Sequence, residues 1–481
     1  MAKHRRIAES PQAPETATAV VPQPTTAASS SVKRSSVMTW PLILISLVAG
    51  FLTQLVWGER DQPDDWASLW IGGVLVDKGQ IDHLYDHNPV DFSAMSGDAW
   101  LTAAHDVSAP FPHPFVQNPL FAQALSYLTK IMSFDTSVLW LLFGSGAAVV
   151  VIAAASYFLW FNRPMPWGLA ALVTVVILCL PATINSLWLG QTTPLIVAGV
   201  IYGLAASRTR PWLAGIILGL VASIKLTPYA LIVVMLFFAY RRRAALWALG
   251  TTAVLVALMF ISIDMSVIST WLDRLETINS SVLVGAANQS IASMLASDLG
   301  VPEFAVSLVT DYPDSVKLIP LSIAIVVTLL ATAVAWWNPV YRFQLLITSA
   351  WLIATAFSSI VWTHYMIVLV VPVMGFAAMS GTRFTSQWPY VAIAALVGLL
   401  SFPVTNPIGA IPFTSGYAYS GTTAMLVGIA VLLLVGGCHA AAVRHSAVVG
   451  SATDYESGSV GSAVQPEPMI LFDLFKRSSR A

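Results

Sequence analysis

Long apolar runs recur along almost the whole chain, and they constrain its fold more than any other feature. Backbone polar groups inside a bilayer must bond within their own segment, so a run that crosses the bilayer forms a helix. A crossing takes roughly 20 residues. About twelve runs are candidates, several of them short, near residues 39–57, 136–160, 165–182, 192–206, 211–224, 228–240, 244–263, 318–337, 343–360, 365–380, 388–402 and 420–441.

The composition agrees with this interpretation. Of the 481 residues, 57% are hydrophobic and only 10% are charged, whereas soluble domains carry about 25% charged residues. We therefore predict an all-α polytopic membrane protein, a bundle of about 12 transmembrane helices. A net charge of -1 gives no electrostatic reason to expect a nucleic-acid partner.

Polar segments divide the chain into three predicted parts. Residues 1–37 are rich in Ala, Pro, Ser and Thr, a composition typical of a disordered tail. Residues 38–445 form the transmembrane domain, which includes two large outer loops at about 58–117 and 264–317. Residues 446–481 begin Ser/Gly-rich and form a second disordered tail.

The arginines predict the orientation of the bundle. With the N-terminal tail inside, six successive inside segments carry Arg163, then Arg208 and Arg210, then Arg241 to Arg243, then Arg342, Arg383 and Arg444. Both outer loops are acidic instead. Because cytoplasmic loops carry an excess of Lys and Arg, we expect both tails in the cytoplasm.

In this orientation, the polar groups of the membrane part that are suited to chemistry fall on the outer face. They are Asp64, Asp65, Gln191, Lys225, Asn288 and His364. A chain that only anchors itself has no reason to gather acid, amide, ammonium and imidazole groups at one surface. The distribution indicates an active site embedded at the membrane surface.

The acids and the lysine have the clearest chemical use. Asp64 and Asp65 open the first outer loop, where a carboxylate can take a proton from an attacking hydroxyl. They can equally be two solvated loop acids. Lys225 is the only basic residue between Pro211 and Tyr240 and breaks the positive-inside pattern. An outward cation suits an anionic phosphate, although snorkelling to the headgroups is the alternative.

The remaining candidates are hydrogen-bonding and aromatic groups. Gln191 follows Gly190 at an outer helix end, where it can bind a sugar hydroxyl or only cap a turn. Asn288 and Gln289 lie in the second outer loop and can line a sugar site, although Asn288-Gln289-Ser290 is also a glycosylation sequon. Further candidates are His364 for a phosphate, and Trp362 and Tyr365, which suit an aromatic belt equally well.

Several classes of chemistry have no support in the sequence. It contains no Walker loop, no dinucleotide fingerprint and no zinc-ligand spacing. We therefore expect no metal and no cofactor. Cys179 and Cys438 lie in apolar runs and are expected to be buried small hydrophobes rather than a disulfide or a metal site.

These residues, in this order and on one face, resemble glycosyltransferase family 87 of the GT-C superfamily over about residues 60–380. The resemblance rests on Asp65, Gly79, Leu84-Tyr85-Asp86, Gly190-Gln191, Ala214-Gly215, Gly219, Lys225, Pro228, Asn288-Gln289-Ser290, Ser358, Trp362 and His364, with Arg241-Arg242-Arg243 on the inner side. One departure lies before the second span, where the family often has Tyr-Pro-Pro and this chain reads Pro114-Phe115-Val116-Gln117-Asn118-Pro119-Leu120.

The resemblance implies an inverting transferase of the actinobacterial plasma membrane with its active site on the extracytoplasmic face. It would move mannose or arabinofuranose from a polyprenyl-phosphate carrier to a glycolipid or lipoglycan acceptor. Asp65 would be the general base, with Asp64 as its substitute. Lys225 and His364 would hold the donor phosphate, whereas Gln191, Asn288, Gln289, Trp362 and Tyr365 would contact sugar or acceptor. The stretch from Trp362 to Tyr365 is more similar to the mannosyl branch of the family.

Two hypotheses that place the protein in another functional class stay open. A lipid or sugar transporter would need polar groups near the bilayer midplane, and this chain has few within its spans. A non-catalytic envelope assembly protein is opposed only by the candidate site itself.

Overall fold

The computed structural model describes residues 36–59, 63–88, 90–109, 112–285, 288–297, 306–380 and 420–450. Helices dominate this part of the chain, which confirms the predicted all-α polytopic class. Both predicted tails lie almost wholly outside the described residues, as do Arg383 and the predicted span at 388–402.

Six helical segments in the described residues are long and apolar enough to cross a membrane. They are α1 (Trp40–Trp57), α5 (Phe134–Phe161), α11 (Arg242–Ser262), α14 (Ser315–Trp337), the 3₁₀ turns of η3 (Thr363–Leu369) with α16 (Val370–Ser380), and the greater part of α18 (Ser420–Gly450). A seventh crossing is formed if α6 (Trp167–Leu178) and α7 (Pro181–Trp188) count as one.

Of the roughly twelve predicted spans, several of them short, the described residues supply six or seven that are long enough to cross a membrane, together with the shorter apolar helices Thr193–Ala206 and Pro211–Ile224. α6 covers residues 167–178 of the predicted span 165–182, and the chain bends by 66° between α6 and α7. Pro181 begins the new helix, since proline has no N–H to continue the old one. The predicted span 228–240 yields only the nine-residue helix α10 (Pro228–Leu236).

Three further helices complete the bundle, namely α8 (Thr193–Ala206), α9 (Pro211–Ile224) and α15 (Arg342–Ala356). Glycines allow close packing between α9 and α11. A Cβ at Gly215 would lie 2.3 Å from Trp247 Cβ, and one at Gly219 would lie 2.6 Å from the Ala248 carbonyl oxygen. Gly215 and Gly219, which are part of the family resemblance, are therefore explained by the close packing of these two helices.

The first predicted outer loop folds into helices with a core of their own. They are α2 (Asp64–Asp77), the 3₁₀ turn η1 (Ile81–His83) and α3 (Asp98–Asp106), followed by α4 (Pro119–Thr129). Large side chains such as Leu84, Tyr85, Trp100 and Phe115 are buried among these elements.

The second predicted outer loop joins the first. It contains α12 (Met265–Ser280), β1 (Val282–Gly285), α13 (Ile291–Ala296) and β2 (Val306–Val309). β1 and β2 pair antiparallel, with Val282 opposite Val309. The first loop extends this pair, because Phe92 N–H donates to the Val306 carbonyl at 2.9 Å and Leu308 N–H to the Val90 carbonyl at 2.9 Å.

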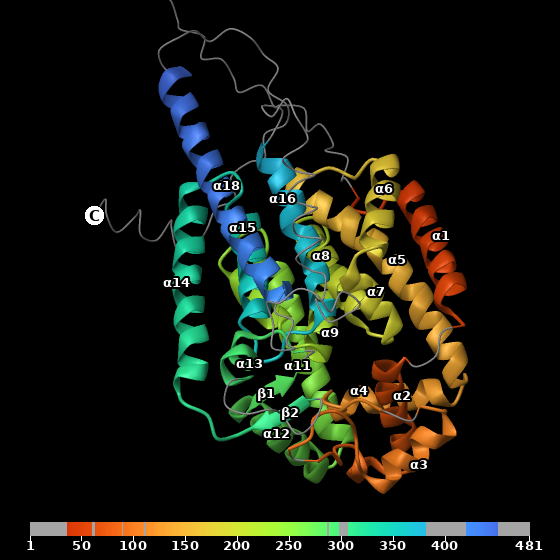
Figure 1. Cartoon of the computed structure of the whole chain (residues 1–481). Coiled ribbons are helices and arrows are strands. Elements are labelled where there is room, and N and C mark those ends of the chain that lie inside the picture. The colour runs from red at the N-terminus through yellow and green to blue at the C-terminus, as the bar shows by residue number, and fades with distance from the viewer. Residues whose placement is uncertain are drawn as a thin grey trace, which may run out of the picture. The chain divides into compact units, whose positions relative to one another are not determined.

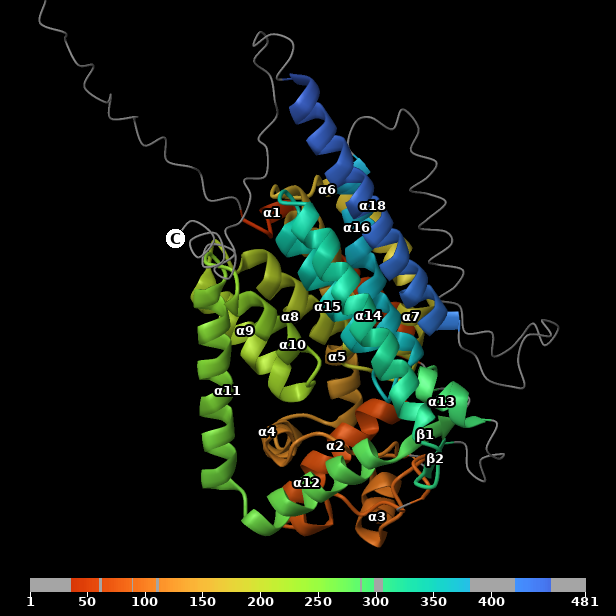
Figure 2. The same ribbon diagram turned by 90° about the vertical axis from the view of Figure 1, so that its left-hand side faces the viewer.

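The two loops therefore form one layer across one end of the bundle, where Figures 1 and 2 show α2, α3, α4, α12, β1 and β2 together. We call this the loop end. At the other end, the arginine end, Asn162, Arg208, Arg241 and Gln344 line a common cavity. α5, which ends just before Arg163, reaches the same end (Figure 1). α15 begins there with Arg342, and the C-terminal part of α18, which contains Arg444, lies there as well. The predicted inside segments thus share one end of the bundle wherever the structure describes them.

Candidate active site

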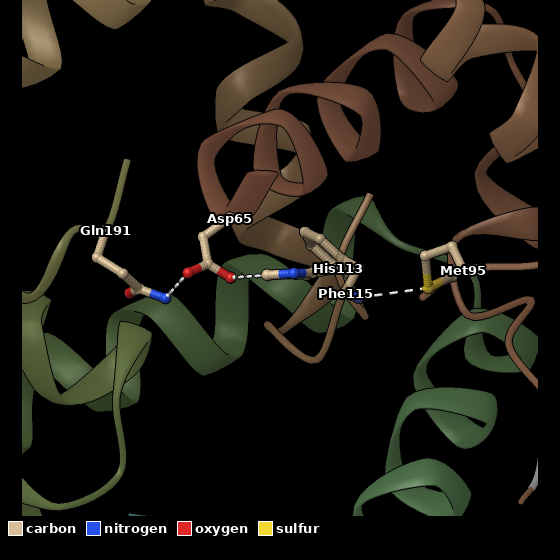
Figure 3. Close-up of polar contacts among 5 residues, drawn as sticks. All are labelled: Asp65, Met95, His113, Phe115 and Gln191. Atoms are coloured by element: carbon tan, nitrogen blue, oxygen red, sulfur yellow. Dashed lines mark hydrogen bonds and ion pairs between the residues drawn. The ribbon is translucent and has the colours of Figure 1, made fainter. Parts of the chain in front are cut away.

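Asp65 is the centre of a polar cluster between the bundle and the loop end (Figure 3). Its Oδ1 lies 2.7 Å from His113 Nδ1, and its Oδ2 accepts a hydrogen bond from Gln191 Nε2. The backbone N–H of Asp65 donates to the Leu189 carbonyl at 3.0 Å. Asp65 and Gln191, which the sequence placed on one face, are therefore in direct contact.

Local sequence explains why these two groups meet. Asp65 is the second residue of α2, where the positive end of the helix dipole favours a carboxylate. Gly190 follows α7 with φ +66°, and a Cβ there would lie 2.7 Å from Pro63 Cβ and 2.9 Å from Trp66 Cβ. Only glycine allows this turn to approach α2 so closely, and the turn presents Gln191 to Asp65.

His113 is the member of the cluster that the sequence analysis missed. Burial lowers the pKa of His113, but the hydrogen bond and charge of Asp65, with the charge of Asp64, outweigh it, so the pKa is raised overall. The imidazole therefore favours its protonated form more strongly than a histidine in water. Its only sequence signal was its place between Pro112 and Pro114, beside the departure from the family pattern.

Asp64 takes no part in this hydrogen-bonded cluster. Its Oδ1 is buried and has no hydrogen-bond partner among the described residues. Burial raises the pKa of Asp64, an effect that the charge of His113 partly offsets. Asp64 is thus close enough to His113 for their charges to interact, but Asp65 alone of the two acids is held by hydrogen bonds from His113 and Gln191.

Lys225 lies between α9 and α10, close enough to Asp65 for their charges to interact. It follows the last residue of α9, and its Nζ donates to Thr193 Oγ1 at 3.3 Å and sits 3.9 Å from the centre of the Tyr365 ring. Burial lowers the pKa of Lys225 to about 7, and the charge of Asp65 opposes this shift. The ammonium rests on a hydroxyl and an aromatic face, which leaves its charge available for an anion.

His364 lies deeper in the same region. Its side chain belongs to η3, is only 2% exposed, and lies 4.8 Å from Tyr365 between ring centres. The charges of Lys225 and His113 both act on it. Its Nδ1 has no hydrogen-bond partner among the described residues. Such a buried polar atom calls for an explanation, and a bound ligand would supply one.

Asn288 and Gln289 are placed differently from the other predicted residues. Asn288 Nδ2 donates to the carbonyls of Leu283 and Ser359, and its Oδ1 accepts from the N–H groups of Ser290 and Val361. Gln289 Nε2 donates to Thr363 Oγ1, and its Oε1 accepts from Gly421 N–H. The two amides tie the second loop to the segment that precedes His364, and Trp362 packs with Leu283 and Leu308 beside them.

A mostly apolar pocket, open to the outside on one side, adjoins Lys225 and has a volume of about 410 Å³ with that open space included. Its lining comes from α8, α10, α15 and η3 and includes Ile196, Val200, Lys225, Trp351, Tyr365 and Val368. The ammonium of Lys225 thus stands at the edge of an apolar pocket with an acid nearby. Within the described residues, no three His, Cys, Asp or Glu side chains gather as a metal site would require.

The fold and this cluster together define a polytopic membrane protein with a hydrogen-bonded acid, a lysine and an apolar pocket at one end of its helix bundle. The chain belongs to glycosyltransferase family 87, whose sequence model matches residues 115–361, just over half of its length. Gln191, Lys225, Asn288 and Gln289 lie within the match.

Two curated relatives share the name polyprenol-phosphate-mannose-dependent alpha-(1-2)-phosphatidylinositol mannoside mannosyltransferase. The protein from Mycobacterium tuberculosis is 29% identical over 268 residues, covering 48% of this chain and 59% of the relative. That from Mycolicibacterium smegmatis is 28% identical over 265 residues, covering 49% and 56%. The chain therefore spans less than two thirds of the length of either relative.

Proposed function

We propose that this protein transfers mannose, with inversion, from a polyprenyl-phosphate carrier to a glycolipid or lipoglycan acceptor. Membership of glycosyltransferase family 87 supports glycosyl transfer. The names of the two relatives support a polyprenyl-phosphate mannose donor and suggest a phosphatidylinositol mannoside as acceptor. An arabinofuranosyl donor has no comparable support among the relatives.

The observation that carries the proposal is the position of Lys225. Its side chain lines the apolar pocket and is close enough to Asp65 for their charges to interact. A polyprenyl-phosphate sugar has the same order of parts, since the sugar follows the phosphate and the phosphate follows an apolar chain. The first isoprenoid unit would fill the pocket lined by Ile196 and Val200, the phosphate would meet Lys225, and the sugar would lie toward Asp65.

The transfer step then needs two charges on opposite sides of the sugar. The acceptor hydroxyl loses its proton to the basic centre formed by Asp65 and its partner. Its oxygen bonds to the anomeric carbon, while the bond from that carbon to the phosphate oxygen breaks and its electron pair stays on the phosphate. Lys225 stabilises the charge that develops there, and His364 donates one hydrogen bond from its Nδ1–H to an oxygen of the same phosphate.

The other predicted residues have supporting roles in this proposal. Gln191 holds the carboxylate of Asp65 and keeps its amide oxygen for sugar. Tyr365 fixes the ammonium of Lys225, and Trp362 offers an aromatic face near the acceptor side. Asn288 and Gln289, whose hydrogen bonds go to neighbouring segments, shape the site by positioning the loop before His364.

The proposed placement in the cell follows from the two ends of the bundle. With the arginine end in the cytoplasm, the loop end and the site lie on the extracytoplasmic face of the plasma membrane. Both termini are then cytoplasmic, and the donor reaches the site from the lipid phase.

The experiment compares Asp65→Asn with Asp77→Asn, because Asp77 ends the same helix and only pairs with Lys130 at the surface. Membranes with equal amounts of each inserted protein receive radiolabelled polyprenyl-phosphate mannose, and label is followed into glycolipid. We expect transfer by the wild type and Asp77→Asn and its loss in Asp65→Asn. Full transfer by Asp65→Asn would refute the assignment, and transfer only from an arabinofuranose donor would refute the choice of sugar.

A further inference from the structure

The side chain of Asn118 caps two helices at once. Asn118 is the N-cap residue of α4, where its Oδ1 accepts a hydrogen bond from Phe121 N–H at 3.0 Å. Its Nδ2 donates to the Ser223 carbonyl, 105 positions further along the chain, at 2.6 Å. Because one partner is a backbone N–H and the other a backbone carbonyl, only this orientation of the amide satisfies both. Pro119 favours the extended conformation of Asn118, with φ −66° and ψ 151°.

The second of these bonds lies at the end of α9, two residues before Lys225. Ser223 is the last residue but one of α9, and the last carbonyls of a helix have no partner within the helix. The amide of Asn118 supplies a partner for one of them. Lys225 then leaves the helix in an extended conformation, with φ −131° and ψ 128°. Asn118 therefore holds the backbone from which the lysine side chain departs.

Close packing connects Asn118 to the helix that carries Asp65. α4 lies beside α2 at the loop end (Figures 1 and 2). A Cβ at Gly73 of α2 would lie 2.9 Å from Leu125 Cβ of α4, and Leu125 is buried in the same apolar cluster as Ile71 of α2. A series of direct contacts thus runs from the helix of the acid, through α4 and Asn118, to the segment of the lysine.

The tip of the Lys225 side chain is held separately, by the bundle. Its Nζ donates to Thr193 Oγ1 at 3.3 Å and lies 3.9 Å from the centre of the Tyr365 ring. Neither of these residues belongs to the first loop, whereas Asn118 does. In the proposed transfer the acid and the lysine act on opposite sides of one sugar, so the rate depends on their separation. A misplacement of about 1 Å can cost about 10²-fold in rate.

We propose that Asn118 is a positioning residue for the transfer, which sets the place of Lys225 relative to Asp65. This inference rests on the proposed function and leaves the roles of the acid and the lysine as they stand there. Asn118 acts through the backbone of Ser223. Without its hydrogen bond the end of α9 is released from the first loop, and the ammonium no longer meets the donor phosphate where the sugar faces Asp65.

The test uses the full chain in lipid nanodiscs, with initial rates of mannose transfer measured at varied polyprenyl-phosphate mannose. The variant is Asn118→Ser, because serine caps a helix as well as asparagine does but has no amide to donate to the Ser223 carbonyl. Asn118→Asp replaces it if Asn118→Ser does not fold, since a carboxylate keeps the cap and has no hydrogen to donate. The matched control is Gln123→Glu, the same amide-to-acid change on α4, where the side-chain oxygen accepts from Ser262 Oγ at 3.0 Å.

We expect Asn118→Ser to lower kcat/KM for the lipid donor by roughly 10–100-fold, through both a higher KM and a lower kcat, because the lysine is displaced from the phosphate. Gln123→Glu should match the wild type. In a Lys225→Gln background, Asn118→Ser should change kcat/KM by no more than about twofold, because the ammonium that it positions is already absent.

Two results would overturn the inference while leaving the proposed function intact. One is a folded Asn118→Ser, or Asn118→Asp, with the wild-type KM and kcat. The other is a loss on substitution of Asn118 that is equally large with and without Lys225, because a general disturbance of the fold would add to the loss of the lysine instead of disappearing with it. Absence of transfer by the wild type itself would instead refute the proposed function and the inference together.

Discussion

Replacing Gly190 with alanine tests the contact that brings Gln191 to Asp65. Gly190 has φ +66°, a left-handed conformation that costs an alanine about 1–2 kcal/mol. The new Cβ would also lie 2.7 Å from Pro63 Cβ, well inside the separation of roughly 3.5–4.0 Å that two carbons prefer. Relieving such an overlap by shifting the backbone costs about 1–3 kcal/mol more. We expect Gly190→Ala to lower the free energy of unfolding by about 2–5 kcal/mol.

Gly79→Ala is the matched control. Gly79 has φ +71°, and a Cβ there would meet no atom within 4 Å. This variant should lose only the conformational cost of about 1–2 kcal/mol. The difference between the two variants therefore isolates the collision with α2.

The two variants should also differ in activity. Moving Gly190 displaces Leu189 and Gln191, which hold the backbone and the side chain of Asp65. A displacement of about 1 Å in a catalytic group can cost about 10²-fold in rate. Thermal unfolding and initial transfer rates of both purified proteins, in the same detergent, measure the two effects. Equal stability of the two variants, with a wild-type rate for Gly190→Ala, would show that the turn does not pack on α2 as described.

Three other predictions concern the remaining parts of the site. Lys225→Gln should raise KM for the lipid donor and lower kcat, because the phosphate loses its cation, whereas Lys78→Gln, at a surface pair with Asp106, should change neither in a steady-state assay. Asn288→Ala should lower the free energy of unfolding by about 2–4 kcal/mol, because four backbone groups lose their partner in the Asn288 amide, which chemical denaturation measures. Since the pKa of His113 is raised in the folded protein, its pairing with Asp65 stabilises the fold fully below the unfolded pKa of about 6.5. This stabilisation is lost as the pH rises through the folded pKa, so the unfolding temperatures of the wild type and His113→Asn should converge at alkaline pH.

The sequence predicted the class of fold and the end of the bundle at which the site lies. Long apolar runs identify the helices, and the positions of the arginines distinguish the cytoplasmic ends of the helices from the outer ends. Both features can be recognised locally along the chain. The number of full spans was not predictable in the same way. Whether an apolar run continues straight depends on local breaks, such as the one before Pro181 that separates α6 from α7.

The partners within the site were predictable only in part. Lys225 was identified because it departs from the apolar pattern around it, and Asp65 and Gln191 because they lie at the outer ends of predicted spans. His113 was missed because it lies among prolines in a polar loop, and only the folded loop layer brings it to Asp65. The four backbone bonds of Asn288 were equally hidden, since an amide that binds sugar and one that ties two segments look the same in sequence.

The central claim is that a lipid-linked phosphate, held at Lys225, delivers the sugar. The most direct test supplies purified protein in nanodiscs with phosphatidylinositol mannoside and either polyprenyl-phosphate mannose or a nucleotide-linked mannose. The account predicts mannose transfer from the lipid donor alone, with release of polyprenyl phosphate in equal amount. Transfer from the nucleotide donor, or no transfer from the lipid donor, would contradict it.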